Sequence, residues 1–255
     1  MPDPRAPSAF NAALTSLTQS WRRGWAALGP AALLLATTHV LRDQVGSTAL
    51  WAVLMVGALL WTIQAQAVAY RLALGLSPPP LAGARVTRDV PRLIAVWLLQ
   101  SLLLAILTAL MLTVVGAVAF GIASVGHGFL AAEPRTWTPA MGPVGRPLAG
   151  AVALVGLAGI VWVKARLGFS PAATVDRQAI QVLSAWPLTR GRVLAVVAAM
   201  LVAAAPTVAV VWGLGLAGAL HIWPGALLLC LMAIGVTLPL NAGLMTYLYR
   251  RSTSD

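Results

Sequence analysis

The stretch KARLGFSPAATVDRQAIQVLSAWPLTRGR, residues 164–192, decides the fold because it is the longest polar interruption in an apolar chain. It holds five of the seventeen Lys and Arg residues. An apolar run over 148–163 precedes it and another begins at Val193, and each is about long enough to cross a bilayer with help from its flanks. The chain is therefore predicted to leave the membrane near residue 164 and to re-enter it near residue 193.

Within this stretch, an amphipathic helix is predicted from Ser170 to Trp186, followed by a break at Pro187. Ser170 and Pro171 suit the N-cap and the first helical position. The apolar residues that follow recur every three or four positions, and the intervening residues are polar. Such a helix is too polar to span and suits the membrane interface. A similar pattern predicts a second surface helix over residues 10–21.

An Arg-Leu pair closes the span before this stretch, a Pro-Ala pair follows, and the run WPLTRG precedes the next span. The residues Pro239 through Tyr247, Tyr249 and Arg250 belong to the last predicted span. These features resemble a bacterial multi-pass membrane family, the one related to the membrane domain of some glycerophosphoryl diester phosphodiesterases. The chain differs from the family at Ala185, where Ser is usual. The resemblance implies a fold and a location, and not phosphodiesterase activity, because these 255 residues hold no soluble phosphodiesterase domain.

The composition excludes an ordinary soluble domain. Hydrophobic residues make up 60% of the chain and charged residues 9%, with a mean hydropathy of +0.87, whereas a soluble domain has about 25% charged residues. The net charge of +11 comes from arginines between the apolar runs, so it does not indicate nucleic-acid binding. The one cysteine, Cys230, lies in an apolar run and is expected to behave as a small hydrophobic residue.

The sequence thus predicts an all-α integral membrane helical bundle of about six transmembrane helices with amphipathic interfacial helices. Three regions are expected: a cytoplasmic tail and amphipathic helix (1–24), a six-span membrane domain (25–251) and a cytoplasmic tail (252–255). The expected spans cover residues 25–41, 48–70, 93–120, 148–163, 193–220 and 226–249.

Two groups of residues are candidate sites. The first is a possible lipid- or partner-binding group, in which Arg85, Arg88 and Arg92 share one helical face: Arg85, Arg88, Arg92, Arg166, Trp186, Thr189, Arg190 and Gly191. Within it, Thr189 is expected to cap the fifth span and Arg190 to meet a lipid phosphate or a backbone carbonyl. The second group comprises polar residues inside spans, which either line a polar cavity or bond between helices: Gln64, Gln66, Gln100 and Asn241.

Catalytic chemistry is not indicated. No nucleophile–base motif or Gly-rich phosphate loop occurs. A proton-coupled transporter usually needs a carboxylate inside a span, but all six acidic residues lie outside the predicted spans. His39, His127 and His221 lack metal-ligand spacing, so neither a metal nor another cofactor is expected. Two functions stay open: a non-enzymatic scaffold that organises anionic lipids or membrane partner proteins, and a transporter, channel or lipid-handling protein with a cavity between helical hairpins.

The topology follows from the charges, because Lys and Arg concentrate in cytoplasmic loops. Fourteen of the seventeen lie in the two tails and in the loops after spans two and four, which places both termini in the cytoplasm. Reporter fusions at Gly142 are expected to report outside, and fusions at Gln178 or after Asp255 inside. An external reporter at Gln178 would rule out the six-span topology.

Overall fold

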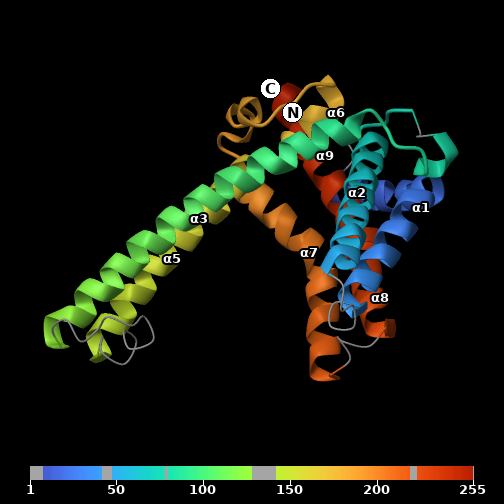
Figure 1. Ribbon diagram of the computed structural model, residues 1–255. Coiled ribbons are helices and arrows are strands. Elements are labelled where there is room, and N and C mark those ends of the chain that lie inside the picture. The colour runs from blue at the N-terminus through green and yellow to red at the C-terminus, as the bar shows by residue number, and fades with distance from the viewer. Residues whose placement is uncertain (1–7, 42–47, 78–79, 128–141, 219–222, 255) are drawn as a thin grey trace. The chain divides into compact units, whose positions relative to one another are not determined.

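The computed structural model describes residues 8–41, 48–77, 80–127, 142–218 and 223–254, and all regular secondary structure in these ranges is helical (Figure 1). Six helical segments are long and apolar enough to cross a membrane, which confirms the predicted fold class: Ala9–Leu41, Thr48–Ala73, Asp89–Ser124, Gly142–Arg177, Val193–Leu216 and Trp223–Ser254. The helices are α1 (Ala9–Leu41), α2 (Thr48–Ala73), α3 (Asp89–His127), α5 (Gly142–Arg166), α6 (Ser170–Arg177), α7 (Val193–Leu216), α8 (Trp223–Cys230) and α9 (Leu238–Ser254). Short turns η1 (Pro80–Gly83), η3 (Leu183–Ala185) and η4 (Pro187–Thr189) are 3₁₀-helical, and η5 (Leu231–Thr237) is a π-helix.

The chain divides into two compact units. Unit 1 comprises residues 1–97 and 166–255, and unit 2 comprises residues 98–165. Unit 2 pairs α3 with α5, where Gly156 allows close approach, since a Cβ there would lie 2.8 Å from the sulfur of Met111. Its helices expose apolar side chains such as Leu154 and Val155, as expected of helices surrounded by lipid.

Helix α1 packs inside unit 1 through small residues and turns large apolar ones outward. Ala13, Ser16, Ser20, Gly24, Ala27 and Ala31 are buried at spacings of three and four. Phe10 is 68% exposed and Trp25 is 59% exposed. This pattern fits a membrane, where lipid already solvates large apolar groups and helices associate through close packing of small residues.

The predicted surface helix over residues 10–21 is not a separate helix in the structure. It is the first part of α1, with no break before the first span. Its small polar residues Ser16 and Ser20 are buried, and Ser16 fits against α9.

A break in the last helical segment organises unit 1. Pro239 has no N–H, so a carbonyl one turn earlier loses its helical partner, and the preceding turns widen into the π-helix η5. The indole Nε1 of Trp21 donates to the Gly235 carbonyl at 2.8 Å. The Ser16 hydroxyl donates to the Pro239 carbonyl, also at 2.8 Å. The Trp21 side chain of α1 thus satisfies a backbone carbonyl that a membrane could not hydrate.

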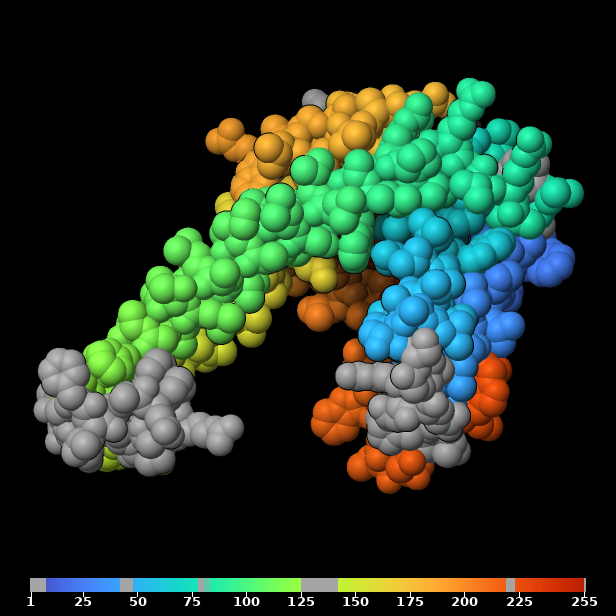
Figure 2. Space-filling model, in the orientation of Figure 1, coloured from blue at the N-terminus to red at the C-terminus, as the bar shows by residue number. Residues whose placement is uncertain are grey.

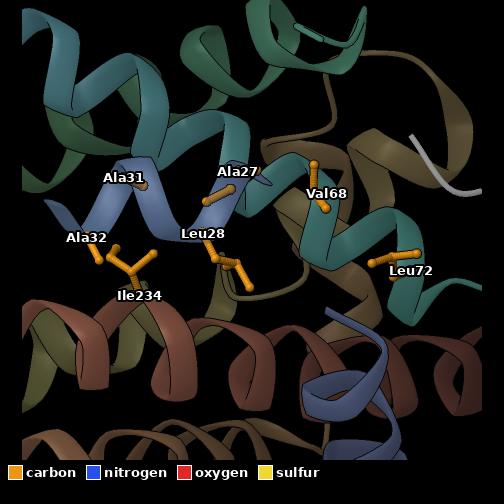
Figure 3. Close-up of a cluster of buried hydrophobic side chains, with 8 residues drawn as sticks. Ala27, Leu28, Ala31, Ala32, Val68, Leu72 and Ile234 are labelled. Atoms are coloured by element: carbon orange, nitrogen blue, oxygen red, sulfur yellow. The ribbon is translucent and has the colours of Figure 1, made fainter. Parts of the chain in front are cut away.

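The apolar core of unit 1 lies where α1, α2 and η5 meet. The cluster consists of Ala27, Leu28, Ala31 and Ala32 from α1, Ala65, Val68 and Leu72 from α2, and Ile234 from η5. Figure 3 shows Ala32 of α1 close to Ile234 of η5. Four of these eight are alanines, so the helices approach closely with little side-chain volume between them.

Two glycine-to-alanine variants test this packing. At Gly243 a Cβ would lie 2.7 Å from the Ser16 Cβ and 2.9 Å from the Ala12 carbonyl oxygen, so Gly243→Ala is expected to destabilise by about 1–3 kcal/mol. At Gly57 nothing lies within 4 Å, so Gly57→Ala should stabilise its helix by up to about 1 kcal/mol. Thermal unfolding in detergent measures both. Equal shifts in the same direction would contradict the close approach of α1 to α9.

Candidate functional site

Polar contacts of unit 1 gather in one region, where α2 and α9 end and where α3 and α7 begin. Helix α6 lies there against both α2 and α9. We call this region the arginine end. It contains Arg71, Arg85, Arg88, Asp89, Arg92, Arg166, Asp176, Trp186, Thr189, Arg190, Tyr249 and Arg250.

Asp89 is the buried acid of this region, with a side chain only 3% exposed. Its carboxylate accepts from Arg71 at 2.7 Å and from Arg92 at 3.4 Å. It is also the first residue of α3, where a negative charge is favoured by the helix dipole, while Arg71 lies in the last turn of α2. Of the three arginines predicted on one face, Arg92 is therefore engaged internally, whereas Arg85 and Arg88 are exposed.

Gln64, predicted as a possible cavity-lining residue, instead holds the segment between α2 and α3. Its amide nitrogen donates to the carbonyls of Gly83 (2.8 Å) and Arg85 (2.9 Å). Its amide oxygen accepts from the Thr87 backbone N–H at 3.3 Å. These three bonds satisfy a fully buried amide and fix the course of the loop.

The other cavity candidates lie in both units. Gln66 and Asn241 are half-buried in unit 1, and Gln100 belongs to unit 2. Among the described residues no group of three or more His, Cys, Asp or Glu could hold a metal ion. His221 and the side chain of His127 lie outside the described residues.

Arg166, Trp186 and Thr189 form one contact. The Arg166 guanidinium lies 5.6 Å from the centre of the Trp186 ring, a cation–π distance. It also donates to the Trp186 carbonyl and to the Thr189 hydroxyl, each at 3.4 Å. Thr189 is fully buried, and its hydroxyl lies 2.8 Å from the Trp186 carbonyl and 3.3 Å from the Arg166 carbonyl. The end of one span is thereby tied to the start of the next.

The predicted cap at Thr189 is wrong. Helix α7 begins after Arg192, with no side-chain cap, because the Thr189 hydroxyl is used inside the turn η4. Arg190 is exposed, in keeping with its predicted place at the surface. Gly191 has a φ of +75°, and nothing lies near its Cβ position, so it serves the turn and not a close helix approach.

The predicted helix from Ser170 to Trp186 starts within one residue of the expected place but ends early, and its N-cap is Phe169 and not Ser170. Helix α6 stops at Arg177, where Gln178 adopts a left-handed conformation with φ 52°. Residues 170–175 are buried, so α6 packs into unit 1 and does not lie free on a membrane surface. Phe169 meets the Tyr249 ring edge-on at 6.3 Å, and the Tyr249 hydroxyl donates to Asp176 at 2.9 Å.

Arg250 closes the same region from the C-terminal side. Its guanidinium donates to the carbonyl of Leu74, just past the end of α2. A cation here satisfies a carbonyl at a helix C-terminus and suits its partial negative charge.

Sequence reasoning missed the parts played by Arg71, Asp89 and Tyr249. A signal existed for Asp89, since Asp-Val-Pro is a helix-start pattern with an acid in the first turn and Pro91 close behind. The partners Arg71 and Tyr249 are set by tertiary packing and leave no local signal.

Comparison of the chain with protein-family models, with curated proteins and with solved structures finds no match. The site must therefore be interpreted from its own geometry.

Neighbouring substitutions separate internal contacts from surface charge. Thr189→Val keeps the shape but removes the buried hydroxyl, so it is expected to cost about 1–3 kcal/mol of stability. Arg190→Ala, one residue further on and exposed, should change stability in detergent by less than about 0.5 kcal/mol. Thermal unfolding in detergent compares the two. If Arg190→Ala were the more damaging, the buried Thr189 contact would not be what joins the two spans.

Proposed function

We propose that the protein is a non-enzymatic scaffold of a bacterial inner membrane, which gathers anionic lipids or partner proteins at the exposed arginines of unit 1. The observation that carries this proposal is an imbalance of available charge. Exposed arginines on unit 1 are Arg22, Arg23, Arg85, Arg88, Arg177, Arg190, Arg250 and Arg251, of which Arg250 also donates to the Leu74 carbonyl. The acids described there are already engaged: Asp89 lies between two arginines, and Asp176 accepts from Tyr249.

Such a surface suits anionic headgroups, since each Lys or Arg near an anionic membrane contributes about 1 kcal/mol. The charge asymmetry of the sequence supports a cytoplasmic position for these arginines and for both termini. The resemblance to the multi-pass family related to the phosphodiesterase membrane domain supports a bacterial inner membrane.

The alternative, a transporter or channel, has less support. Such a function needs polar side chains that are available to a solute. The most deeply buried of the span amides, Gln64, is committed to the backbone of a loop.

The test is lipid retention by native mass spectrometry after gentle extraction from mixed phosphatidylglycerol and phosphatidylcholine. The intact protein is expected to retain phosphatidylglycerol preferentially. Replacing Arg22, Arg23, Arg190 and Arg251 by Gln should reduce that preference, by up to about fivefold for each arginine that contacts the surface.

The control is Arg146→Gln, an exposed arginine on the predicted opposite side, which should leave lipid retention unchanged. An unaltered phosphatidylglycerol preference in the fourfold variant would refute the proposed lipid role of this surface.

A further inference from the structure

We propose that the loop 80–88, between α2 and α3, docks into the headgroup layer of an anionic membrane. Arg85 and Arg88 would bind lipid phosphates, while Leu81 and Val86 enter the border of the acyl chains. This inference rests on the proposed function and names the element that engages the lipid.

The loop does not stand away from the helices but folds back along them. Gln64, which bonds to Gly83 and Arg85, lies nine residues before Ala73, the end of α2. A Cβ on Gly83 would lie 3.1 Å from Val68, five residues before that end. At about 1.5 Å per residue, this part of the loop lies roughly 8–13 Å back along the span. Figure 1 shows it beside α1 and α2.

The loop is held firmly by its backbone. Gln64 binds two of its carbonyls and one N–H. Gly83, with a φ of +94°, is buried, and a Cβ there would lie 3.0 Å from Ala27. At its far end Asp89 is fixed by Arg71 and Arg92. A loop ordered in this way loses little entropy when it meets a partner.

The side chains left outside combine charge with large apolar groups. Leu81 is 76% exposed and Val86 is 69% exposed, and Arg85 and Arg88 are exposed beside them. Figure 2 shows this segment standing out at the surface next to α1. Leu81 also adopts a left-handed backbone with φ 52°, a conformation that costs a non-glycine residue about 1 kcal/mol or more. Glycine or asparagine would adopt this conformation at a lower free-energy cost.

The surroundings of the loop favour lipid as the occupant. It lies against α1 and α2, both of which are membrane spans, at a level set back from the end of α2. Arginine stems lie along apolar surface while the guanidinium reaches headgroup oxygens. The acid nearest in sequence, Asp89, is paired with Arg71 and Arg92, so Arg85 and Arg88 are left to anions from outside the loop.

The experiment uses a bimane fluorophore and brominated lipids, which quench it only on contact. The labelled variants are Leu81→Cys and, separately, Val86→Cys, each combined with Cys230→Ala to remove the native thiol. Each is placed in nanodiscs of mixed phosphatidylglycerol and phosphatidylcholine in which one lipid or the other carries bromine. The reference position is exposed Ser77, labelled in the same way, which follows the end of α2.

Labels at Leu81 and Val86 are expected to be quenched, more strongly when phosphatidylglycerol carries the bromine, and the label at Ser77 little. Adding Arg85→Gln and Arg88→Gln should reduce the preference for brominated phosphatidylglycerol, by about fivefold for each arginine. Absence of quenching at both Leu81 and Val86 would overturn the inference and leave water or a protein partner as the occupant. The two proposals can fail separately. If neither label is quenched but the phosphatidylglycerol preference is still lost in the variant lacking Arg22, Arg23, Arg190 and Arg251, the loop does not dock into the membrane and the proposed function stands.

Discussion

The hydrogen bond from the Trp21 indole to the Gly235 carbonyl is the contact on which the rest of unit 1 depends. A proline inside a span frees a carbonyl that neither water nor lipid can satisfy, and the cost is several kcal/mol unless another group reaches it. Trp21 reaches it only because Gly235 has no side chain, since a Cβ there would lie 2.5 Å from the indole ring. The packing of α1 against the last helical segment thus follows from three residues, Trp21, Gly235 and Pro239, that form no recognisable motif in the sequence.

The arginine end follows from the same rule applied to charges. Cations and anions near a membrane are stable when paired or when they reach headgroups. Asp89, Arg71 and Arg92 are paired with one another, whereas Arg85 and Arg88 are exposed. Internal pairing therefore selects which arginines a membrane surface can meet, and this selection cannot be made by counting basic residues.

Class and span positions were predictable because they depend on long apolar runs, which a bilayer selects by length. The re-entry at Val193 and the helix start at Ser170 were predictable because Pro and polar residues punctuate the chain there. The inner face of α1 was not predictable. In a helix of a soluble protein, apolar residues mark the face that packs inside. Lipid and protein interior are both apolar, so the sequence does not show whether Phe10 and Trp25 face lipid or the neighbouring helices. The task of Gln64 was equally hidden, because its partners are backbone atoms of a distant loop.

The π-helix also affects how the last helical segment contacts two neighbouring helices, α1 and α7. In an α-helix each residue advances about 100° around the axis, whereas a π-turn accommodates an additional residue and falls behind that advance. The side chains after η5 are consequently re-aimed relative to those before it. Two residues within η5 itself face different helices: Gly235 meets Trp21 of α1, while the Thr237 hydroxyl, two residues on, meets Thr207 of α7 at 2.7 Å. An insertion or deletion in this segment would leave its length across the bilayer almost unchanged. It would nevertheless rotate the side chains on one side of the change about the helix axis, so the contact with either α1 or α7 would be lost.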